Sequence, residues 1–115
     1  MIRLTALLKR NPDLSHDEFV DHWANQHGPL IRDNPALARH FVRYEQHPLA
    51  EDQSFAVGGY DGMAIQWFHS MDDMVAFVSE PSYAESVMPD ERRFLDLDGI
   101  AVTFTTDPVV MIDDA

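Results

Sequence analysis

The order of strand-like and helix-like segments constrains the fold of this chain most. Ile2 to Lys9 alternates in the pattern of a strand, and residues 38–47, 60–69 and 100–112 are rich in residues that strands favour. Asp107-Pro108 interrupts the last segment, which suits an edge strand or a bulge. With helices predicted between the strands, the order is β-α-β-β-α-β. This is the ferredoxin-like split motif, an α+β fold with an antiparallel four-stranded sheet.

The first predicted helix has a clear beginning and end. Ser15 and Glu18 have the spacing of a capping box, in which each side chain satisfies a free backbone N–H group at the helix start. A helix over residues 16–26 follows, and Gly28 and Pro29 are expected to close it. Two further helices are predicted, one between Ser70 and Pro81 and a short one over residues 89–97.

Several predicted strands carry apolar residues on both faces. In the segment 60–69, Met63 and Trp67 lie on one face, while Ala64 and Phe68 lie on the other. A monomer with one sheet face in water should instead alternate cleanly between apolar and polar residues. We therefore expect a homodimer in which two sheets cover each other.

The charge of the chain excludes some partners. Twenty acidic residues against eight basic ones give a formal charge of −12, which repels nucleic acid and anionic membrane surfaces. No run of about 18 apolar residues is present, and the chain begins with a short alternating segment rather than a signal peptide. We expect a cytoplasmic protein with a single domain over residues 1–112 and a short acidic tail over 113–115.

The residues do not indicate a metal or a nucleotide cofactor. The chain has no cysteine, which excludes thiolate zinc sites and a cysteine nucleophile. His22 and His27 are five residues apart, so on an α-helix they point about 140° apart, unlike the i,i+4 pair of a helical zinc site. His40, His47 and His69 could form a metal site only if tertiary structure brought them together, and no glycine-rich phosphate loop follows a strand.

Several strings of residues resemble those of the EthD family. The segment from Phe19 to Leu30, centred on Trp23-Ala24-Asn25-Gln26-His27-Gly28-Pro29, is similar to the central segment of EthD-type proteins. Residues 43–46, 60–64 and 90–95 resemble the family in the same order. The resemblance implies a dimeric α+β barrel, a superfamily that includes cofactor-free enzymes acting on small hydrophobic, aromatic or polyketide-like metabolites. It also implies a link to oxidative degradation, in which the founding member is described as an accessory protein.

His27 is the main candidate for chemistry. It lies one helical turn beyond Trp23 and on the line of His16 and Val20, so we expect it to face the sheet. The ordinary pKa of a histidine, near 6.5, suits a general acid or base when a partner fixes the ring tautomer. The other interpretation is a buried histidine that caps the helix and binds a backbone carbonyl.

Tyr44 and Asp61 are the predicted companions of His27. Asp61 either orients His27 or ionises a substrate, or it anchors a turn beside Gly62. Tyr44 either points into the same cavity or is an interface residue with a satisfied hydroxyl group. Five more side chains are predicted to line a pocket for a flat or cyclic ligand, unless they only fill the core: Trp23, Phe41, Met63, Trp67 and His69.

These residues support two functional hypotheses, and an assembly module without a pocket is a third option. The first is a cofactor-free enzyme, or a subunit of an oxidative pathway, that uses His27 to move a proton in isomerisation, decarboxylation with dehydration, or oxygenation. The second is a non-catalytic binding or accessory protein that holds or delivers the metabolite, with His27 as a structural cap.

Overall fold

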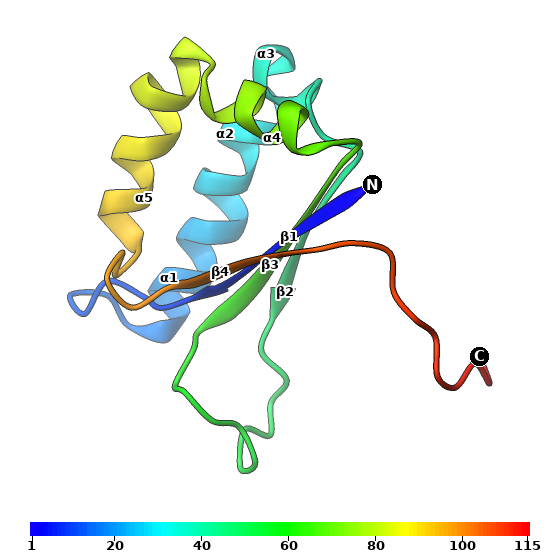
Figure 1. The fold of residues 1–115 in the computed structure, drawn as a ribbon. Coiled ribbons are helices and arrows are strands. Elements are labelled where there is room, and N and C mark those ends of the chain that lie inside the picture. The colour runs from blue at the N-terminus through cyan, green and yellow to red at the C-terminus, as the bar shows by residue number, and fades with distance from the viewer.

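The computed structural model describes residues 1–115 and has the predicted ferredoxin-like architecture (Figure 1). Its four strands form one antiparallel sheet in the order β2-β3-β1-β4. The strands are β1 (Ile2–Leu8), β2 (Arg43–Pro48), β3 (Gly62–Phe68) and β4 (Ala101–Thr105). The helical elements are α1 (His16–His22), η1 (Trp23–His27), α2 (Gly28–Arg32), α3 (Pro35–Ala38), α4 (Met71–Val78), η2 (Tyr83–Val87) and α5 (Met88–Phe94).

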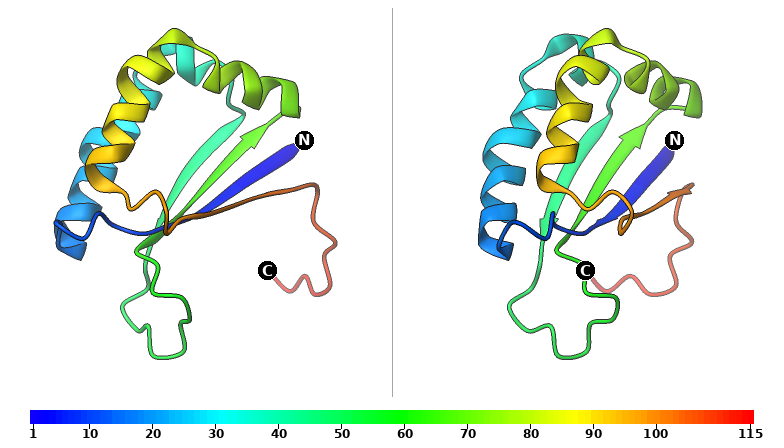
Figure 2. Two further views of the ribbon diagram at one scale, coloured as in Figure 1. Left: turned by 60° about the vertical axis from the view of Figure 1, so that its left-hand side comes forward. Right: turned by 90° about the vertical axis from the view of Figure 1, so that its left-hand side faces the viewer.

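All of the helices lie on one side of the sheet (Figure 2). The side chains of Ala6, Leu8, Ala64 and Phe68 are buried and alternate along β1 and β3, so this face of the sheet packs against the helices. The opposite face carries no helix.

None of the helices has both the length and the apolar character that a membrane span requires.

The first helix does not end at Gly28 and Pro29, which corrects the prediction. Gly28 has a right-handed helical φ of −54°, and the chain continues through α2 to Arg32. The helix widens over η1, where the Gly28 N–H donates to the Trp23 carbonyl in the i→i+5 pattern of a π-helix. Since Pro29 has no N–H and its ring needs space, a widened turn directly before it lets the helix continue.

The second long helix also contains a π-helical turn before a proline. The predicted helix over 89–97 begins earlier, because Tyr83 opens a second π-helical turn in which the Met88 N–H donates to the Tyr83 carbonyl. Pro89 then lies in the first turn of α5, which ends at Phe94. Each widened turn thus begins with an aromatic residue and precedes a proline six positions later.

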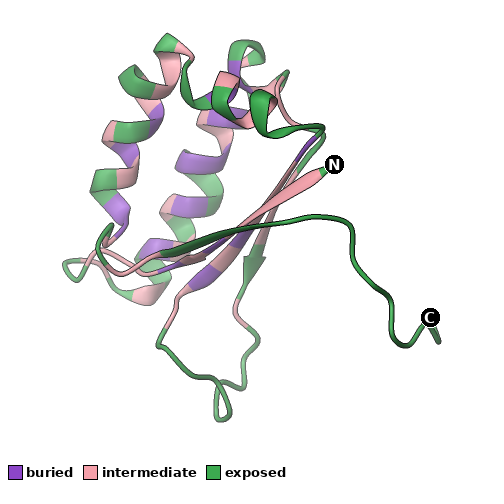
Figure 3. Ribbon diagram, viewed as in Figure 1, coloured by how far each residue is buried: buried purple, intermediate pink, exposed green.

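Two strands are shorter than predicted. The segment 38–47 becomes a strand only at Arg43, because its first residue, Ala38, belongs to the short helix α3. Asn34 caps this helix, and its side chain accepts the Ala36 N–H. The last strand ends at Thr105, and residues 106–115 form an exposed arm without helix or strand (Figure 3). The predicted strand over Val109–Ile112 is therefore wrong, whereas β4 does lie at an edge of the sheet.

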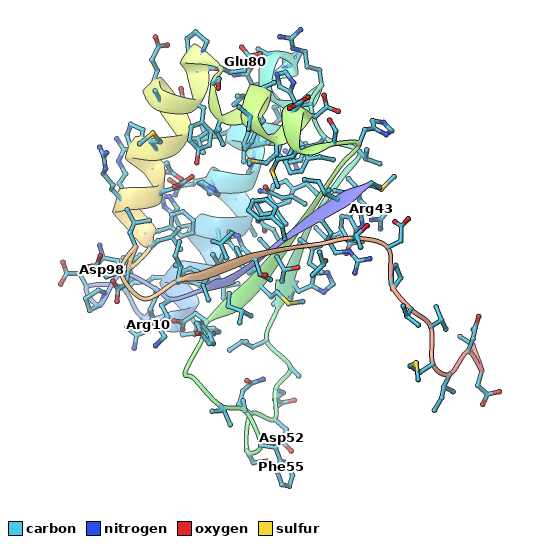
Figure 4. All side chains as sticks on the ribbon, viewed as in Figure 1. Arg10, Arg43, Asp52, Phe55, Glu80 and Asp98 are labelled. Carbon is cyan, nitrogen blue, oxygen red and sulfur yellow. The ribbon has the colours of Figure 1, made fainter.

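The loop between β2 and β3 projects from the body of the protein. Asp52 and Phe55 lie at its far end, and the Phe55 side chain is almost fully exposed (Figure 4). Gly58 and Gly59 both have positive φ angles, of 103° and 67°, which glycine adopts without strain. The predicted polar loop over residues 49–59 is confirmed.

The core consists of two clusters. Phe19, Trp23 and Phe94 are buried in the first, and Phe68 and Phe77 in the second. Leu4 and Tyr44 pack against both clusters. At Gly62 a Cβ atom would lie 2.6 Å from the Trp23 ring, so only glycine lets β3 and the first helix approach this closely.

Candidate active site

A cavity of about 200 Å³ lies between the helix-covered face of the sheet and the two long helices. Most of its lining is apolar. Its polar or ionisable side chains are His27, Tyr44, Gln66, Tyr83 and Glu91. Since pockets that bind small molecules combine apolar walls with a few polar groups, this cavity is the candidate site.

His27 lies at this cavity with a buried acidic partner. It is 7% exposed, and its Nδ1 atom is 2.8 Å from Oδ2 of Asp90, which is 2% exposed. A carboxylate only accepts hydrogen bonds, so Nδ1 carries the proton and donates it to Asp90. Nε2 is then unprotonated and has no hydrogen-bond partner within the chain. This is the tautomer that a general base requires.

His22 binds the other oxygen of the same carboxylate. Its Nε2 atom is 2.8 Å from Oδ1 of Asp90, so the carboxylate bridges two histidines of one helix. This corrects the expectation that His22 and His27 point in different directions. The expectation assumed an α-helix, whereas the wider turn of η1 brings residues five apart toward the same side.

Burial lowers the pKa of His27. The loss of hydration disfavours the charged ring and has the largest effect, while the hydrogen bond and the charge of Asp90 act in the opposite direction. The ring of Phe94, with its centroid 4.7 Å from that of His27, forms part of this apolar surrounding. His27 is therefore neutral at pH 7, with Nε2 free to accept a proton.

Glu91 and Tyr83 form a second polar pair at the cavity. The Tyr83 hydroxyl donates to Oε1 of Glu91 over 2.9 Å. Burial raises the pKa of Glu91, and the nearby charge of Asp90 acts in the same direction. Burial and the charge of Glu91 also raise the pKa of Tyr83, so its hydroxyl stays protonated.

Tyr44 lines the cavity from β2, and its hydroxyl group has a hydrogen-bond partner. Burial raises the pKa of its hydroxyl, which accepts a hydrogen bond from Nε2 of Gln46 over 3.1 Å. Gln46 also donates to the Trp23 carbonyl at the start of the first widened turn, over 2.9 Å. Tyr44 is thus tied to the turn that positions His27.

Asp61 does not accompany His27, which corrects one of the predicted arrangements. Its Oδ1 atom is 2.8 Å from Nδ1 of His16, and its Oδ2 atom accepts the backbone N–H of Arg10 over 2.9 Å. These contacts fasten the start of α1 to the chain before β3. The anchoring interpretation of Asp61 thus describes its place in the structure.

The five predicted pocket residues do not lie together. Trp23 lines the cavity, whereas Phe41 packs on Phe68 and lines a separate open groove of about 470 Å³. Met63 and Trp67 lie on the uncovered face of the sheet because β3 alternates, and the guanidinium carbon of Arg3 is 5.4 Å from the Trp67 ring centroid. His69 is exposed beyond the end of β3.

Sequence reasoning did not propose a role for His22, Tyr83, Asp90 or Glu91. Asp90 and Glu91 lie in one of the strings that resemble the EthD family, and this was their only signal.

No group of three or more His, Cys, Asp or Glu side chains has an arrangement that would hold a metal ion.

Comparisons with known proteins agree with this fold. An EthD family protein from Bacillus halodurans is 15% identical, covers 94% of this chain and 99% of its own, and has a TM-score of 0.69. A dimeric ferredoxin-like protein from Thermobifida fusca is 19% identical, with coverages of 90% and 88% and a TM-score of 0.65. SnoaB from Streptomyces nogalater, described as a cofactor-independent oxygenase, is 12% identical, with both coverages at 97% and a TM-score of 0.61.

At these identities the solved structures establish the fold alone. A search of curated proteins found no match. The EthD domain, in contrast, matches residues 11–98, which include every polar group of the cavity. Because this match covers more than half of the chain, the protein belongs to the EthD family.

Proposed function

We propose that this protein binds a small hydrophobic, aromatic or polyketide-like metabolite in the cavity and uses His27 to move a proton without a cofactor. The buried pair of His27 and Asp90 beside an apolar cavity carries this proposal. The description of SnoaB as a cofactor-independent oxygenase supports chemistry of this kind on the fold.

The proposed mechanism assigns a role to each member of the histidine group. Nε2 of His27 takes a proton from a carbon that a neighbouring carbonyl group or ring makes acidic. Asp90 fixes the tautomer of His27 and stabilises the imidazolium that forms, and His22 holds the second oxygen of Asp90 in place. The same step begins an isomerisation, the dehydration that accompanies a decarboxylation, or an oxygenation in which molecular oxygen is the oxidant and reacts with the carbanion.

The apolar lining favours this step. Trp23, Val87 and Phe94 line the cavity with buried apolar side chains. Electrostatic interactions inside such a site are stronger than in water, so the carboxylate of Asp90 stabilises the imidazolium effectively.

Hydrogen exchange at carbon provides a test that does not require the natural substrate. The probe is 1-tetralone, a bicyclic ketone, and proton NMR in D2O follows exchange at the carbon next to its carbonyl group. We expect the wild type to accelerate exchange and His27→Ala to lose about 100-fold of that acceleration, with an unchanged circular dichroism spectrum.

His16→Ala is the matched control, because His16 also binds a carboxylate at 2.8 Å but lies outside the cavity. It should exchange 1-tetralone at the wild-type rate. A His27→Ala protein with full exchange activity would rule out the proposed role of His27.

The alternative is a binding or accessory protein of an oxidative degradation pathway. It is favoured by the position of Asp90 between two histidines, since such a group also holds two helices together. In that case His27→Ala would lower the melting temperature by several degrees, and its affinity for 1-tetralone would equal that of the wild type.

We also propose that the protein is cytoplasmic, with one domain over residues 1–112. In this proposal it acts as a homodimer through the uncovered face of the sheet. Apolar side chains on that face, such as Met63, Ile65 and Trp67, and the dimeric description of a structural neighbour support this. Light scattering after size-exclusion chromatography should give twice the mass of one chain, and Ile65→Asp should give the monomer mass.

A further inference from the structure

The proton transfer assigned to His27 leaves Glu91 and Tyr83 without a role. Glu91 is a half-buried acid on the wall of an apolar cavity, with no basic side chain within salt-bridge distance. Tyr83 occupies its Oε1 atom, whereas Oε2 has no hydrogen-bond partner within the chain. An acid of this kind costs stability, and such groups occur preferentially at functional sites.

The helix α5 places Glu91 in a defined relation to His27. Asp90 and Glu91 are consecutive, so their side chains leave the helix about 100° apart. Asp90 turns to the first helix and binds His27, while Glu91 lines the cavity and binds Tyr83. One helix therefore supplies both the partner of the proposed base and a second acid at the cavity that His27 also lines.

We propose that Glu91, held by Tyr83, donates a hydrogen bond from Oε2 to the carbonyl oxygen of the ligand. The ligand class is then a ketone or related carbonyl compound with an acidic C–H bond beside the carbonyl group. This inference deepens the proposed function and depends on it for the catalytic step, although the binding of the carbonyl oxygen is measurable by itself.

The two residues together complete an enolisation. Nε2 of His27 takes the proton from the carbon, and the C–H electron pair forms a carbon–carbon double bond. The π electrons of the carbonyl group move to its oxygen, which takes the proton of Glu91. The products are a neutral enol, an imidazolium and a carboxylate, and reversal of these transfers at the same or another carbon restores both residues. No oxidant or reductant is required.

The surroundings of Glu91 support its role as a donor. Burial raises its pKa and the charge of Asp90 acts in the same direction, against the opposing hydrogen bond from Tyr83, so a larger fraction of the acid form remains at neutral pH than in an exposed glutamate. The hydroxyl of Tyr83 binds Oε1 in either protonation state of Glu91, so Oε2 is left to face the ligand.

A pair of ligands isolates the contribution of the carbonyl group. The probes are 1-tetralone and tetralin, which have the same ring system with and without the carbonyl oxygen. Quenching of tryptophan fluorescence measures both dissociation constants, because Trp23 lines the cavity. We expect the wild type to bind 1-tetralone about fivefold more tightly than tetralin, and Glu91→Leu to reduce this ratio to about one.

Glu91→Gln separates hydrogen bonding from proton transfer. The amide still donates a hydrogen bond, so the preference for 1-tetralone should remain, whereas exchange at carbon should fall at least tenfold because the amide does not release a proton. Glu85→Leu is the control for surface charge, since Glu85 is exposed in η2, directly before α5, and the variant should match the wild type in both measurements.

The outcomes distinguish this inference from the proposed function. His27→Ala should lose exchange and keep the preference for 1-tetralone. The inference is overturned if folded Glu91→Leu keeps the wild-type ratio, or if the wild type does not prefer 1-tetralone to tetralin. If His27→Ala keeps full exchange while Glu91→Leu loses the preference, the role of His27 fails and the carbonyl site stands.

Discussion

The first helix binds carboxylates at two places, and the two contacts differ mainly in their surroundings. His16 contacts Asp61 and His27 contacts Asp90, each with a nitrogen–oxygen distance of 2.8 Å. The side chains are 40% and 14% exposed in the first pair, but 9% and 3% exposed in the second. The two pairs thus have the same hydrogen-bond distance, but the His16 pair is more exposed to solvent and the His27 pair is buried.

This difference shows why only one of the two contacts is a candidate for catalysis. Asp61 also accepts a backbone N–H, and the His16 side chain is largely accessible to solvent, so this pair holds the start of the helix in place. Asp90 has only histidine side chains as hydrogen-bond partners, and burial lowers the pKa of His27. Chemistry requires the second arrangement, because the ring must be both oriented and poorly hydrated.

The largest expected effect comes from removal of the buried carboxylate. Asp90→Ala leaves two ring N–H groups without an acceptor inside the protein, so it should cost about 3 kcal/mol of unfolding free energy. The melting temperature should fall by roughly 10 °C. Urea unfolding and differential scanning calorimetry measure these changes.

Asp61→Ala is the matched control for that experiment. It removes a carboxylate with the same histidine distance from a wetter place, so we expect a loss of about 1 kcal/mol. If the two variants lost equal stability, the difference in burial between the pairs would have no energetic meaning.

The sequence predicted the type of most elements because their signals are local. The capping box of Ser15 and Glu18 is formed as expected, with both reciprocal hydrogen bonds, and Ser70 caps α4. The continuation of the helix past Gly28 was not predictable from propensity, since the widened turn that admits Pro29 leaves no simple pattern in one sequence.

The candidate site was only partly predictable for a different reason. The inward position of His27 followed from helical periodicity, but its partner Asp90 is 63 residues away in the chain. Asp61 has an equally suitable side chain, and the sequence alone does not distinguish the two carboxylates. The alternation along β3 follows from the sequence, but the face that the helices cover does not, and Met63 and Trp67 lie on the uncovered face rather than at the predicted pocket.

The second prediction concerns the pH dependence of stability. The folded-state pKa of His27 lies below its unfolded value near 6.5, so the unfolded chain takes up this proton first as the pH falls. The stabilisation is present above pH 6.5 and is lost as the pH falls through the folded-state pKa. The wild type should therefore lose more stability between pH 7.5 and 5.5 than His27→Gln, measured by urea unfolding. An equal loss in both proteins would assign the pH dependence to other groups.

The third prediction has the opposite sign. Because burial raises the folded-state pKa of Glu91, its ionisation destabilises the folded protein, and this penalty appears as the pH rises through that pKa. Glu91→Gln removes the charge and keeps an acceptor for the Tyr83 hydroxyl. We expect it to stabilise the protein by about 1 kcal/mol at pH 8, and thermal unfolding at pH 4 should show no gain. A destabilised variant at pH 8 would contradict the assigned cost of this acid.

The smallest expected effect on stability is that of His16→Ala, at the more exposed of the two pairs. His16→Ala removes the exposed ring but leaves Asp61 with the backbone N–H of Arg10, so the carboxylate keeps a partner and stays in contact with water. Exposed ion pairs contribute about 0.2–1 kcal/mol, and alanine is a better helix former than histidine, which offsets part of the loss. The unfolding free energy should therefore fall by no more than about 0.5 kcal/mol, and added salt should reduce the difference further. A larger loss that persists at 1 M salt would mean that the His16 contact contributes as much to stability as that of His27. Burial would then not explain the difference between Asp61 and Asp90.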